Sequence, residues 1–207
     1  SAAYRVRIAL NLKGIPFETI AVSLAPGVSE HRKDEYRVIN PQMLVPFLQD
    51  GDIGIAQSMA ILEYLEETYT ETPLLPCDEP LRSRVRAFCH LIACDIHPLN
   101  NLRVQKYIRN ELGADQEASH DWYVHWIHEG FTAAEQLVGD DTYVIGDTPT
   151  LADTLLVPQM YNARRFNVSL DEFPQLVRIV DACNELAAFK KAAPEQQPDA
   201  ARNSTAL

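Results

Sequence analysis

The sequence predicts two domains of different class, a small α/β domain followed by an all-helical domain. Residues 1–72 mix helical and extended patterns, whereas the long segments that follow have helical periodicity and few strand signals. A proline-rich stretch lies between the two parts, and this composition is typical of a connection. We therefore place the α/β domain at residues 1–72, a linker at 73–80 and the helical domain at 81–207.

The first domain contains five predicted elements. Alternating apolar residues predict a half-buried strand after the first helix. Asp50-Gly51 marks the turn of a hairpin. In the last helix, the apolar residues Ile61, Leu62 and Leu65 share one face. In chain order, the elements are a helix at 2–13, a strand at 16–24, a short helix at 29–38, a hairpin at 45–57 and a helix at 58–69.

This order lacks a leading strand. A parallel pairing through a crossover needs two strands, and only the strand at 16–24 precedes the hairpin. We therefore expect that about ten residues carrying a first strand precede this sequence in the natural protein.

The second domain is predicted to be helical throughout. His97-Pro98 interrupts the first of its helices, and Asn100, Asn101 and Arg103 add polar groups close by. Two interpretations stay open, a helix kink with satisfied polar side chains or a pocket wall facing the first domain. The predicted helices cover residues 81–110, 119–138, 151–164 and 174–188.

Thr150 and Asp153 have the spacing of a capping box before an apolar run, with Pro149 just ahead. Their predicted role is to begin a buried helix. The chain after residue 192 is polar and contains proline, which predicts an extended or frayed end.

Composition limits the classes of function. A net charge of −11 argues against a nucleic-acid partner, because no basic surplus is available to neutralise phosphates. The four cysteines form no CxxC pair and predict a reducing compartment rather than a disulfide framework. No apolar run is long enough to span a membrane, and the first residues lack a signal pattern. We therefore predict a soluble cytoplasmic protein with no membrane partner and no metal site.

Two positions around the hairpin carry candidate binding groups. Pro46 either starts a strand or forms a cis peptide bond that turns the backbone of Val45 towards a peptide-like ligand. Ser58 is a good helix N-cap. Alternatively, the same helix N-terminus binds a carboxylate, with the Ser58 hydroxyl and the Gln57 amide as additional donors.

Two further candidates lie at helix ends. Ser1 either caps the first helix or donates a hydrogen bond to an anion such as a thiolate, which would lower the pKa of a ligand thiol. Arg164-Arg165 ends a helix, where cations complement the dipole, or holds a carboxylate bidentately.

Taken together, these segments resemble the glutathione-transferase superfamily over nearly the whole chain. The first helix resembles the zeta-class signature, a Ser-Ser-Cys-Ser-Trp-Arg-Val-Arg run. The matching segments are SAAYRVRIALNLKG, NPQMLVPFLQDG, QSMAILEYLEETY, IHPLNN, GDTPTLADTLLVPQ and NARRFNVSL.

The resemblance implies a thioredoxin-like first domain that binds glutathione. It implies that the Val45 backbone binds the cysteinyl part and that Gln57 and Ser58 bind the γ-glutamyl group. The other residues it implies are Ser1 as the catalytic and glutathione-binding hydroxyl, His31 at the glycyl end, His97, Asn101 and Arg103 as site lining from the helical domain, and Arg165 at a substrate carboxylate. The positive charge of Arg5 or Arg103 is expected to help Arg165 anchor the dicarboxylate.

The chain departs from the signature at its start. Ser1 matches the second serine of the family motif, and Ala2 stands where the family has cysteine. The first serine, often assigned as the main thiolate stabiliser, falls before Ser1. The alanine is compatible with isomerisation, because that reaction uses the sulfur of glutathione rather than a protein thiol.

The resemblance implies a homodimeric, glutathione-dependent cis–trans isomerase that converts maleylacetoacetate to fumarylacetoacetate. Its partners would be glutathione and a small maleyl dicarboxylate. Three alternatives stay open: maleylpyruvate as the substrate, a general transferase or peroxidase acting on electrophiles, and a binding module without catalysis.

Overall fold

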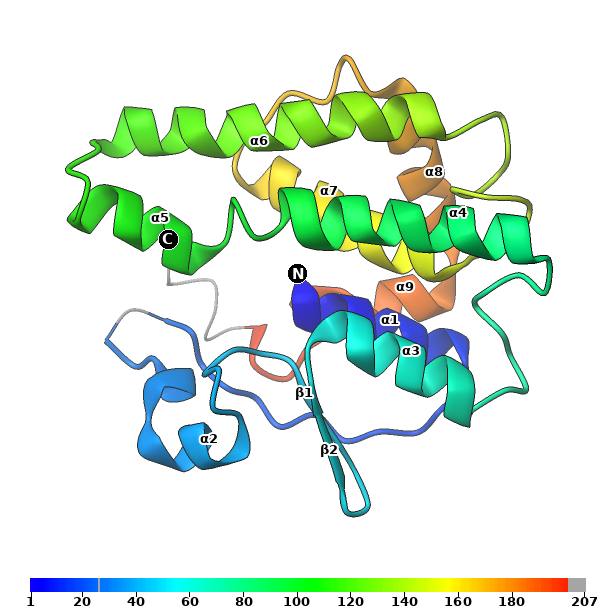
Figure 1. Ribbon diagram of the computed structural model, residues 1–207, viewed down its shortest axis with the longest axis horizontal. Helices are drawn as coiled ribbons and strands as arrows, with labels where there is room; N and C mark the ends of the chain where they lie inside the picture. The colour runs from blue at the N-terminus through cyan, green and yellow to red at the C-terminus, as the bar shows by residue number, and fades with distance from the viewer. Residues whose placement is uncertain (26, 201–207) are drawn as a thin grey trace. The chain divides into compact units, whose positions relative to one another are not determined.

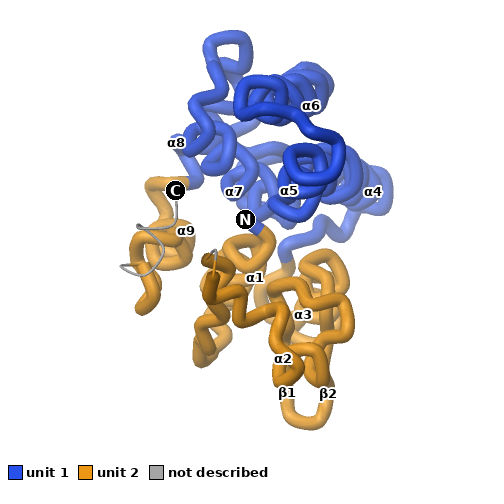
Figure 2. The backbone as a smooth tube through the Cα atoms, turned by 90° about the vertical axis from the view of Figure 1, so that its left-hand side faces the viewer, with its two compact units in different colours: residues 1, 74–183 blue, residues 2–73, 184–207 orange. Residues whose placement is uncertain are grey.

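The computed structural model describes residues 1–25 and 27–200, which form two compact units. We call Ser1 with residues 74–183 the helical unit, and residues 2–73 with 184–200 the mixed unit; Figure 2 colours them separately. The predicted domain limits stay a prediction. The contact units differ from them near the end of the chain, because residues 184–200 group with the first part of the sequence.

The mixed unit contains the short sheet and several helices, of which α3 contacts β2 (Figure 1). Its sheet is an antiparallel hairpin in which Phe47 lies opposite Ala56. Together with the helical unit, it has the predicted fold class of a thioredoxin-like domain joined to a helical domain. The elements are α1 (Ala2–Leu12), η1 (Glu30–Arg32), α2 (Asp34–Ile39), β1 (Phe47–Asp50), β2 (Ile53–Ala56), α3 (Ser58–Thr68), α9 (Ala187–Ala192) and η3 (Pro194–Gln196).

Helix α1 is the centre of the mixed unit, since it packs against both α3 and α9. The predicted apolar face of α3 is confirmed, because Ile61, Leu62 and Leu65 are buried. A buried ion pair fixes the ends of the two helices. The Nζ atom of Lys13 lies 2.5 Å from Oε1 of Glu66 and also donates to the carbonyl of Tyr69 at 2.8 Å.

The predicted strand at 16–24 is wrong. Those residues form no strand, and Ile20 is 82% exposed. Alternation shows which face of a strand would be apolar, but a strand also needs a neighbour for its backbone N–H and C=O groups. Within the described part of the chain, β1 and β2 pair only with each other. The hairpin turn also lies one residue later than predicted, because Asp50 pairs with Ile53 across it.

The helical unit is built around α7, which packs against α4 and η2. Helix α7 is almost entirely buried from its first residue to Met160. The predicted helix at 81–110 is divided into α4, a π-helical segment and α5, so the expected interruption at His97-Pro98 is confirmed. The elements are α4 (Glu79–His90), η2 (Leu91–Ile96), α5 (Leu102–Asn110), α6 (Gln116–Leu137), α7 (Leu151–Arg165) and α8 (Pro174–Glu185), whose last two residues belong to the mixed unit.

The predicted capping box at the start of α7 is confirmed. The Thr150 side chain accepts from the backbone N–H of Ala152 at 3.2 Å, and the Asp153 carboxylate accepts from the backbone N–H of Thr150 at 2.7 Å. The same carboxylate accepts from the backbone N–H of Val144 at 2.9 Å, so it also fixes the loop that precedes the helix.

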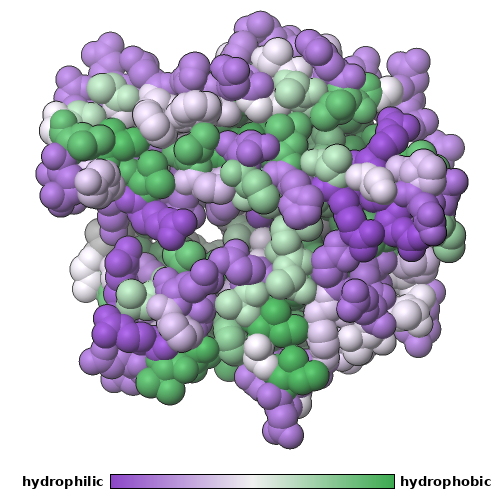
Figure 3. All heavy atoms as spheres, viewed as in Figure 1, coloured by the Kyte–Doolittle hydropathy of each residue, from purple (hydrophilic) through white to green (hydrophobic). Residues whose placement is uncertain are grey.

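The surface mixes hydrophobic and hydrophilic residues, as one face shows in Figure 3. Among the residues that the structure describes, no helix combines the length and the apolar character needed to cross a lipid bilayer.

Gly130 allows α6 to approach η2 closely. A Cβ atom added at Gly130 would overlap the buried side chain of Ile96. We expect Gly130→Ala to lower the free energy of unfolding by about 1 to 3 kcal/mol, because Ile96 must shift within a packed core. Urea denaturation measures this change. Gly139→Ala is the matched control, since no atom lies within 4 Å of its added Cβ. Equal unfolding midpoints for the two variants would contradict the prediction.

Candidate functional site

Arg5 and Ser58 meet where α1 lies against the N-terminus of α3. Arg5 Nη1 donates to Ser58 Oγ at 3.2 Å. Both side chains are buried, with Arg5 1% exposed and Ser58 6% exposed. Arg5 reaches this position because it lies on the buried face of α1, one turn before Ile8 and Ala9.

Ser58 does not cap α3, so the N-cap interpretation is wrong. Ser58 is the first helical residue, and the N-cap residue is Gln57, whose side chain makes no capping hydrogen bond. Gln57 has a φ of 72°, a left-handed conformation that is uncommon for a residue with a side chain. This backbone turns the chain from β2 into α3 and leaves the first N–H groups of the helix to other partners.

The start of α3 has the electrostatics of an anion site. The N-terminus of an eleven-residue helix carries partial positive charge, and the guanidinium of Arg5 adds a full charge beside it. A carboxylate is therefore the kind of group that this position can hold. Gln57 Nε2 also donates to Oε1 of Gln42 at 2.8 Å. Sequence reasoning missed Gln42, although its place after Asn40-Pro41 predicts a turn.

The loop before β1 presents Val45. The Val45–Pro46 peptide bond is cis, the second of the two interpretations of this proline. The Tyr36 hydroxyl and the Asn40 amide both donate to the carbonyl of Leu44, each at 2.8 Å. Burial raises the pKa of Tyr36, which keeps its hydroxyl a neutral donor. Neither contact was predicted, because hydrogen bonds to a loop carbonyl leave no mark in a sequence pattern.

In the helical unit, the structure joins Ser1 to His97. Ser1 Oγ lies 3.1 Å from His97 Nδ1. His97 follows η2, and the turn after it is held by Trp122 Nε1, which donates to the carbonyl of Leu99 at 2.8 Å. This pairing brings together two residues that the resemblance implicates and that lie 96 positions apart.

Asn101 and Arg103 meet at the start of α5. Asn101 is the N-cap of this helix, and its side-chain oxygen accepts from the backbone N–H of Arg103 at 3.1 Å. The Arg103 side chain is exposed. In the mixed unit, His31 is buried in η1. The positions of Asn101, Arg103 and His31 are compatible with roles in ligand binding.

The two arginines at the end of α7 have different surroundings. Arg164 Nη2 lies 3.5 Å from Oδ1 of Asp181 on α8. Arg165 is exposed, and its positive charge acts on the buried Tyr123 hydroxyl. Burial raises the pKa of Tyr123, and the charge of Arg165 opposes this rise. Tyr123 also stacks on Phe166 with ring centroids 4.2 Å apart, a contact that the sequence did not indicate.

The candidate residues thus form several groups within the two units. The mixed unit holds Arg5, His31, Val45, Gln57 and Ser58, and the helical unit holds Ser1, His97, Asn101, Arg103 and Arg165. Across residues 1–25 and 27–200, no group of three or more His, Cys, Asp or Glu side chains is placed to hold a metal ion.

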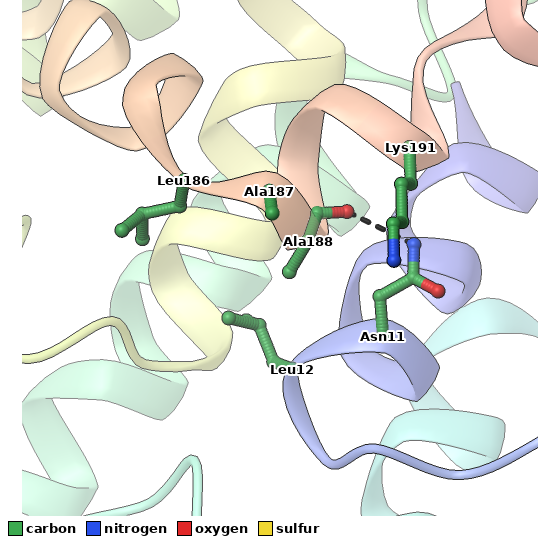
Figure 4. Close-up of a pocket in the computed structure, with 6 residues that line it drawn as sticks. All are labelled: Asn11, Leu12, Leu186, Ala187, Ala188 and Lys191. Atoms are coloured by element: carbon green, nitrogen blue, oxygen red, sulfur yellow. Dashed lines mark hydrogen bonds between the residues drawn. The ribbon is translucent and has the colours of Figure 1, made fainter.

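Two hollows are found in the part of the chain that the structure describes. One has a volume of about 360 Å³ and lies between the end of α1 and the start of α9 (Figure 4). There Asn11 Nδ2 donates to the carbonyl of Ala188 at 2.9 Å, so the amide ties the two helices together. The other has a volume of about 730 Å³ and lies beside α8, where it is lined by Arg164 and Asp181. Of the candidate residues from the sequence, Arg164 lines the second hollow and none lines the first.

The chain is similar to proteins of known family along most of its length. Residues 1–68 match the glutathione S-transferase N-terminal domain, and residues 126–187 match the glutathione S-transferase C-terminal domain. A maleylpyruvate isomerase of Ralstonia sp. is 52% identical, over 96% of this chain and 95% of its own length. A maleylacetoacetate isomerase of Pseudomonas aeruginosa is 45% identical, over 96% of this chain and 94% of its own length.

Solved structures give the same result. A holo structure of maleyl pyruvate isomerase, described as a bacterial zeta-class glutathione S-transferase, has a TM-score of 0.92 and 50% identity, covering 96% of this chain and 94% of that chain. A maleylacetoacetate isomerase from Anaeromyxobacter dehalogenans, with bound dicarboxyethyl glutathione and citrate, has a TM-score of 0.86 and 37% identity, covering 100% of this chain and 93% of that chain.

Proposed function

Because this chain belongs to the zeta class of the glutathione S-transferase family, we propose that it is a glutathione-dependent cis–trans isomerase that converts maleylacetoacetate to fumarylacetoacetate. The observation that carries the proposal is similarity over nearly the whole chain to relatives named as isomerases of maleyl substrates. We further propose a cytoplasmic homodimer, with a glutathione-binding domain at 1–72, a linker at 73–80 and a substrate domain at 81–207.

The start of α3 fits the γ-glutamyl end of glutathione. That end carries a carboxylate, and the helix N-terminus with Arg5 beside Ser58 is an electropositive position with a buried hydroxyl. We assign Gln57 and Ser58 to this group and the backbone of Val45 to the cysteinyl part. We assign the glycyl end to His31.

When bound, glutathione supplies a thiol sulfur that adds reversibly to the maleyl double bond and allows it to rotate. Ser1 is the residue that we assign to this sulfur. Its hydroxyl would donate a hydrogen bond that favours the charged form and so lowers the pKa of the thiol. The contact between Ser1 and His97 fixes where the hydroxyl lies. His97, Asn101 and Arg103 complete the proposed lining.

Arg165 is the residue that we assign to a carboxylate of the substrate. It ends α7, where the guanidinium is exposed, whereas its neighbour Arg164 is paired with Asp181. A guanidinium holds a carboxylate through two parallel hydrogen bonds, which fixes orientation as well as position. Such orientation brings reacting atoms together and contributes directly to rate.

The choice between two maleyl substrates needs a direct comparison. The relatives above include one named for maleylpyruvate and one named for maleylacetoacetate, at 52% and 45% identity. Both substrates carry an activated cis double bond between carboxylate-bearing ends, so the same residues can serve either. The ratio of kcat/KM for the two substrates therefore decides which one the protein prefers.

The test is an isomerase assay of the purified protein on both substrates, with glutathione, without it, and with S-methylglutathione. We expect turnover only with glutathione, because the methylated analogue retains the binding groups and lacks the thiol. Turnover at the same rate without glutathione would contradict the proposal. Faster conjugation of a chlorinated aromatic would favour a general transferase, and glutathione binding without any turnover would favour a binding module. Sedimentation of the same sample tests the homodimer.

A further inference from the structure

We propose that Arg5 positions the Ser58 hydroxyl to bind the γ-glutamyl carboxylate of glutathione, and that it does not bind the maleyl substrate. This inference rests on the proposed function, since it assigns a role within the same glutathione site. It changes the role expected for Arg5 from its charge, which is to help Arg165 anchor the dicarboxylate. Arg5 is therefore a positioning residue, because it acts through Ser58.

Burial separates Arg5 from a diffusing substrate. Its side chain is 1% exposed and lies on the face of α1 that packs against α3. A residue that anchors a dicarboxylate must present its guanidinium to the ligand, as the exposed Arg165 can. Arg5 instead directs Nη1 to Ser58 Oγ at 3.2 Å.

The direction of this hydrogen bond determines what Ser58 can do. A guanidinium only donates, so the oxygen of Ser58 must be the acceptor. The Ser58 hydroxyl therefore keeps its own proton for another partner. Among residues 1–25 and 27–200, the structure gives this hydroxyl no acceptor. Ser58 is 6% exposed, and a buried O–H group without an acceptor is unfavourable unless a ligand supplies one.

The charge of Arg5 acts in the same direction as the hydrogen bond. A cation beside a hydroxyl oxygen polarises the O–H bond and strengthens its donation to an anion. The same cation adds to the positive potential of the α3 N-terminus, in a buried region where screening by water is weak. A carboxylate at this position would accept a hydrogen bond from the Ser58 hydroxyl and would be attracted by the Arg5 charge and the helix N-terminus. The γ-glutamyl carboxylate is the group of glutathione that matches this set.

Steady-state kinetics of Arg5→Met and Arg5→Lys test the assignment, with glutathione and the maleyl substrate varied in turn. We expect Arg5→Met to raise the KM for glutathione at least about tenfold, the scale of a lost charge-assisted hydrogen bond. The KM for the maleyl substrate, and kcat at saturating glutathione, should change less than about threefold. Arg5→Lys keeps the charge and should give a smaller rise in the glutathione KM.

Arg7→Met is the matched control, since Arg7 lies on the same helix and donates through Nε to the carbonyl of Ala192 instead. It should leave the glutathione KM within about threefold of the parent value. A double-mutant cycle adds Ser58→Ala. We expect Arg5→Met to have little further effect on the glutathione KM once Ser58 is alanine, because Arg5 acts through that hydroxyl.

Thermal unfolding identifies variants that fail to fold. If Arg5→Met does not fold, the KM for glutathione is measured on Arg5→Lys instead. A folded Arg5 variant whose KM for glutathione is unchanged would overturn the inference. A variant in which only the KM for the maleyl substrate rises would also overturn it. Calorimetric titration of the parent protein with glutathione separates this failure from failure of the proposed function. A parent protein that binds glutathione without isomerising either substrate overturns the function alone, and the affinities of the variants then test Arg5.

Discussion

Replacing Asp153 with alanine is expected to lower the free energy of unfolding by about 3 to 5 kcal/mol, one of the two largest effects we expect. The Asp153 carboxylate is fully buried and accepts hydrogen bonds from the backbone N–H groups of Thr150 and Val144 at 2.7 and 2.9 Å. Alanine would leave both N–H groups in the core without acceptors, and a buried donor without a partner loses the solvation it had in the unfolded chain. Urea denaturation monitored by circular dichroism measures the loss.

Asp115 provides the matched control for Asp153. It is the N-cap of α6, where its carboxylate accepts from the backbone N–H of Ala118 at 2.8 Å. Asp115 is exposed, so water can replace this hydrogen bond, and Asp115→Ala should cost about 1 kcal/mol. Similar losses for Asp153→Ala and Asp115→Ala would show that burial does not amplify the capping interaction. Asp153→Asn keeps one acceptor oxygen, so its loss in the free energy of unfolding should lie between those of Asp153→Ala and Asp115→Ala.

The parts of the fold that depend on local signals could be predicted from the sequence. The capping box of α7 needs only Thr150 and Asp153 at the right spacing, and the apolar face of α3 needs only periodicity. The strand expected at 16–24 depends on a partner elsewhere in the chain, which alternation cannot supply. Residue pattern therefore predicted the helices better than the sheet.

The sequence names candidate site residues, whose roles stay a prediction, but it could not show the contacts between them. Arg5 and Ser58 are 53 positions apart, and the sequence cannot show that the guanidinium is buried against the hydroxyl. The positive charge of Arg5 predicts contact with the dicarboxylate, and charged residues are mostly exposed, so the sequence gives no reason to expect its burial. Its place among the buried residues of α1 is the one signal that could have indicated otherwise.

Adjacent arginines show the same limit. From the sequence, Arg164 and Arg165 are equally good candidates for binding a carboxylate, because both lie at the end of α7. The structure distinguishes them through Asp181, which pairs with Arg164 from α8. That pairing depends on how α7 and α8 pack, a tertiary feature with no counterpart in the local sequence.

The second large effect is expected from Arg165→Met, which should lower kcat/KM for the preferred maleyl substrate about 30- to 100-fold. This corresponds to about 2 to 3 kcal/mol, the scale of removing one partner from a charge-assisted hydrogen bond to a carboxylate. The KM for glutathione should change less than about threefold, because the proposed glutathione residues remain.

Arg164→Met is the matched control for Arg165→Met, since it removes the same side chain from the preceding position. Arg164 pairs with Asp181 while 43% of its side chain is exposed, and an exposed ion pair of this kind contributes little. Its loss should therefore leave kcat/KM within about threefold of the parent value. Equal losses in the two variants would assign the effect to the end of α7 as a whole. If Arg165→Met raises only the KM for glutathione, Arg165 would be assigned to glutathione rather than to the dicarboxylate.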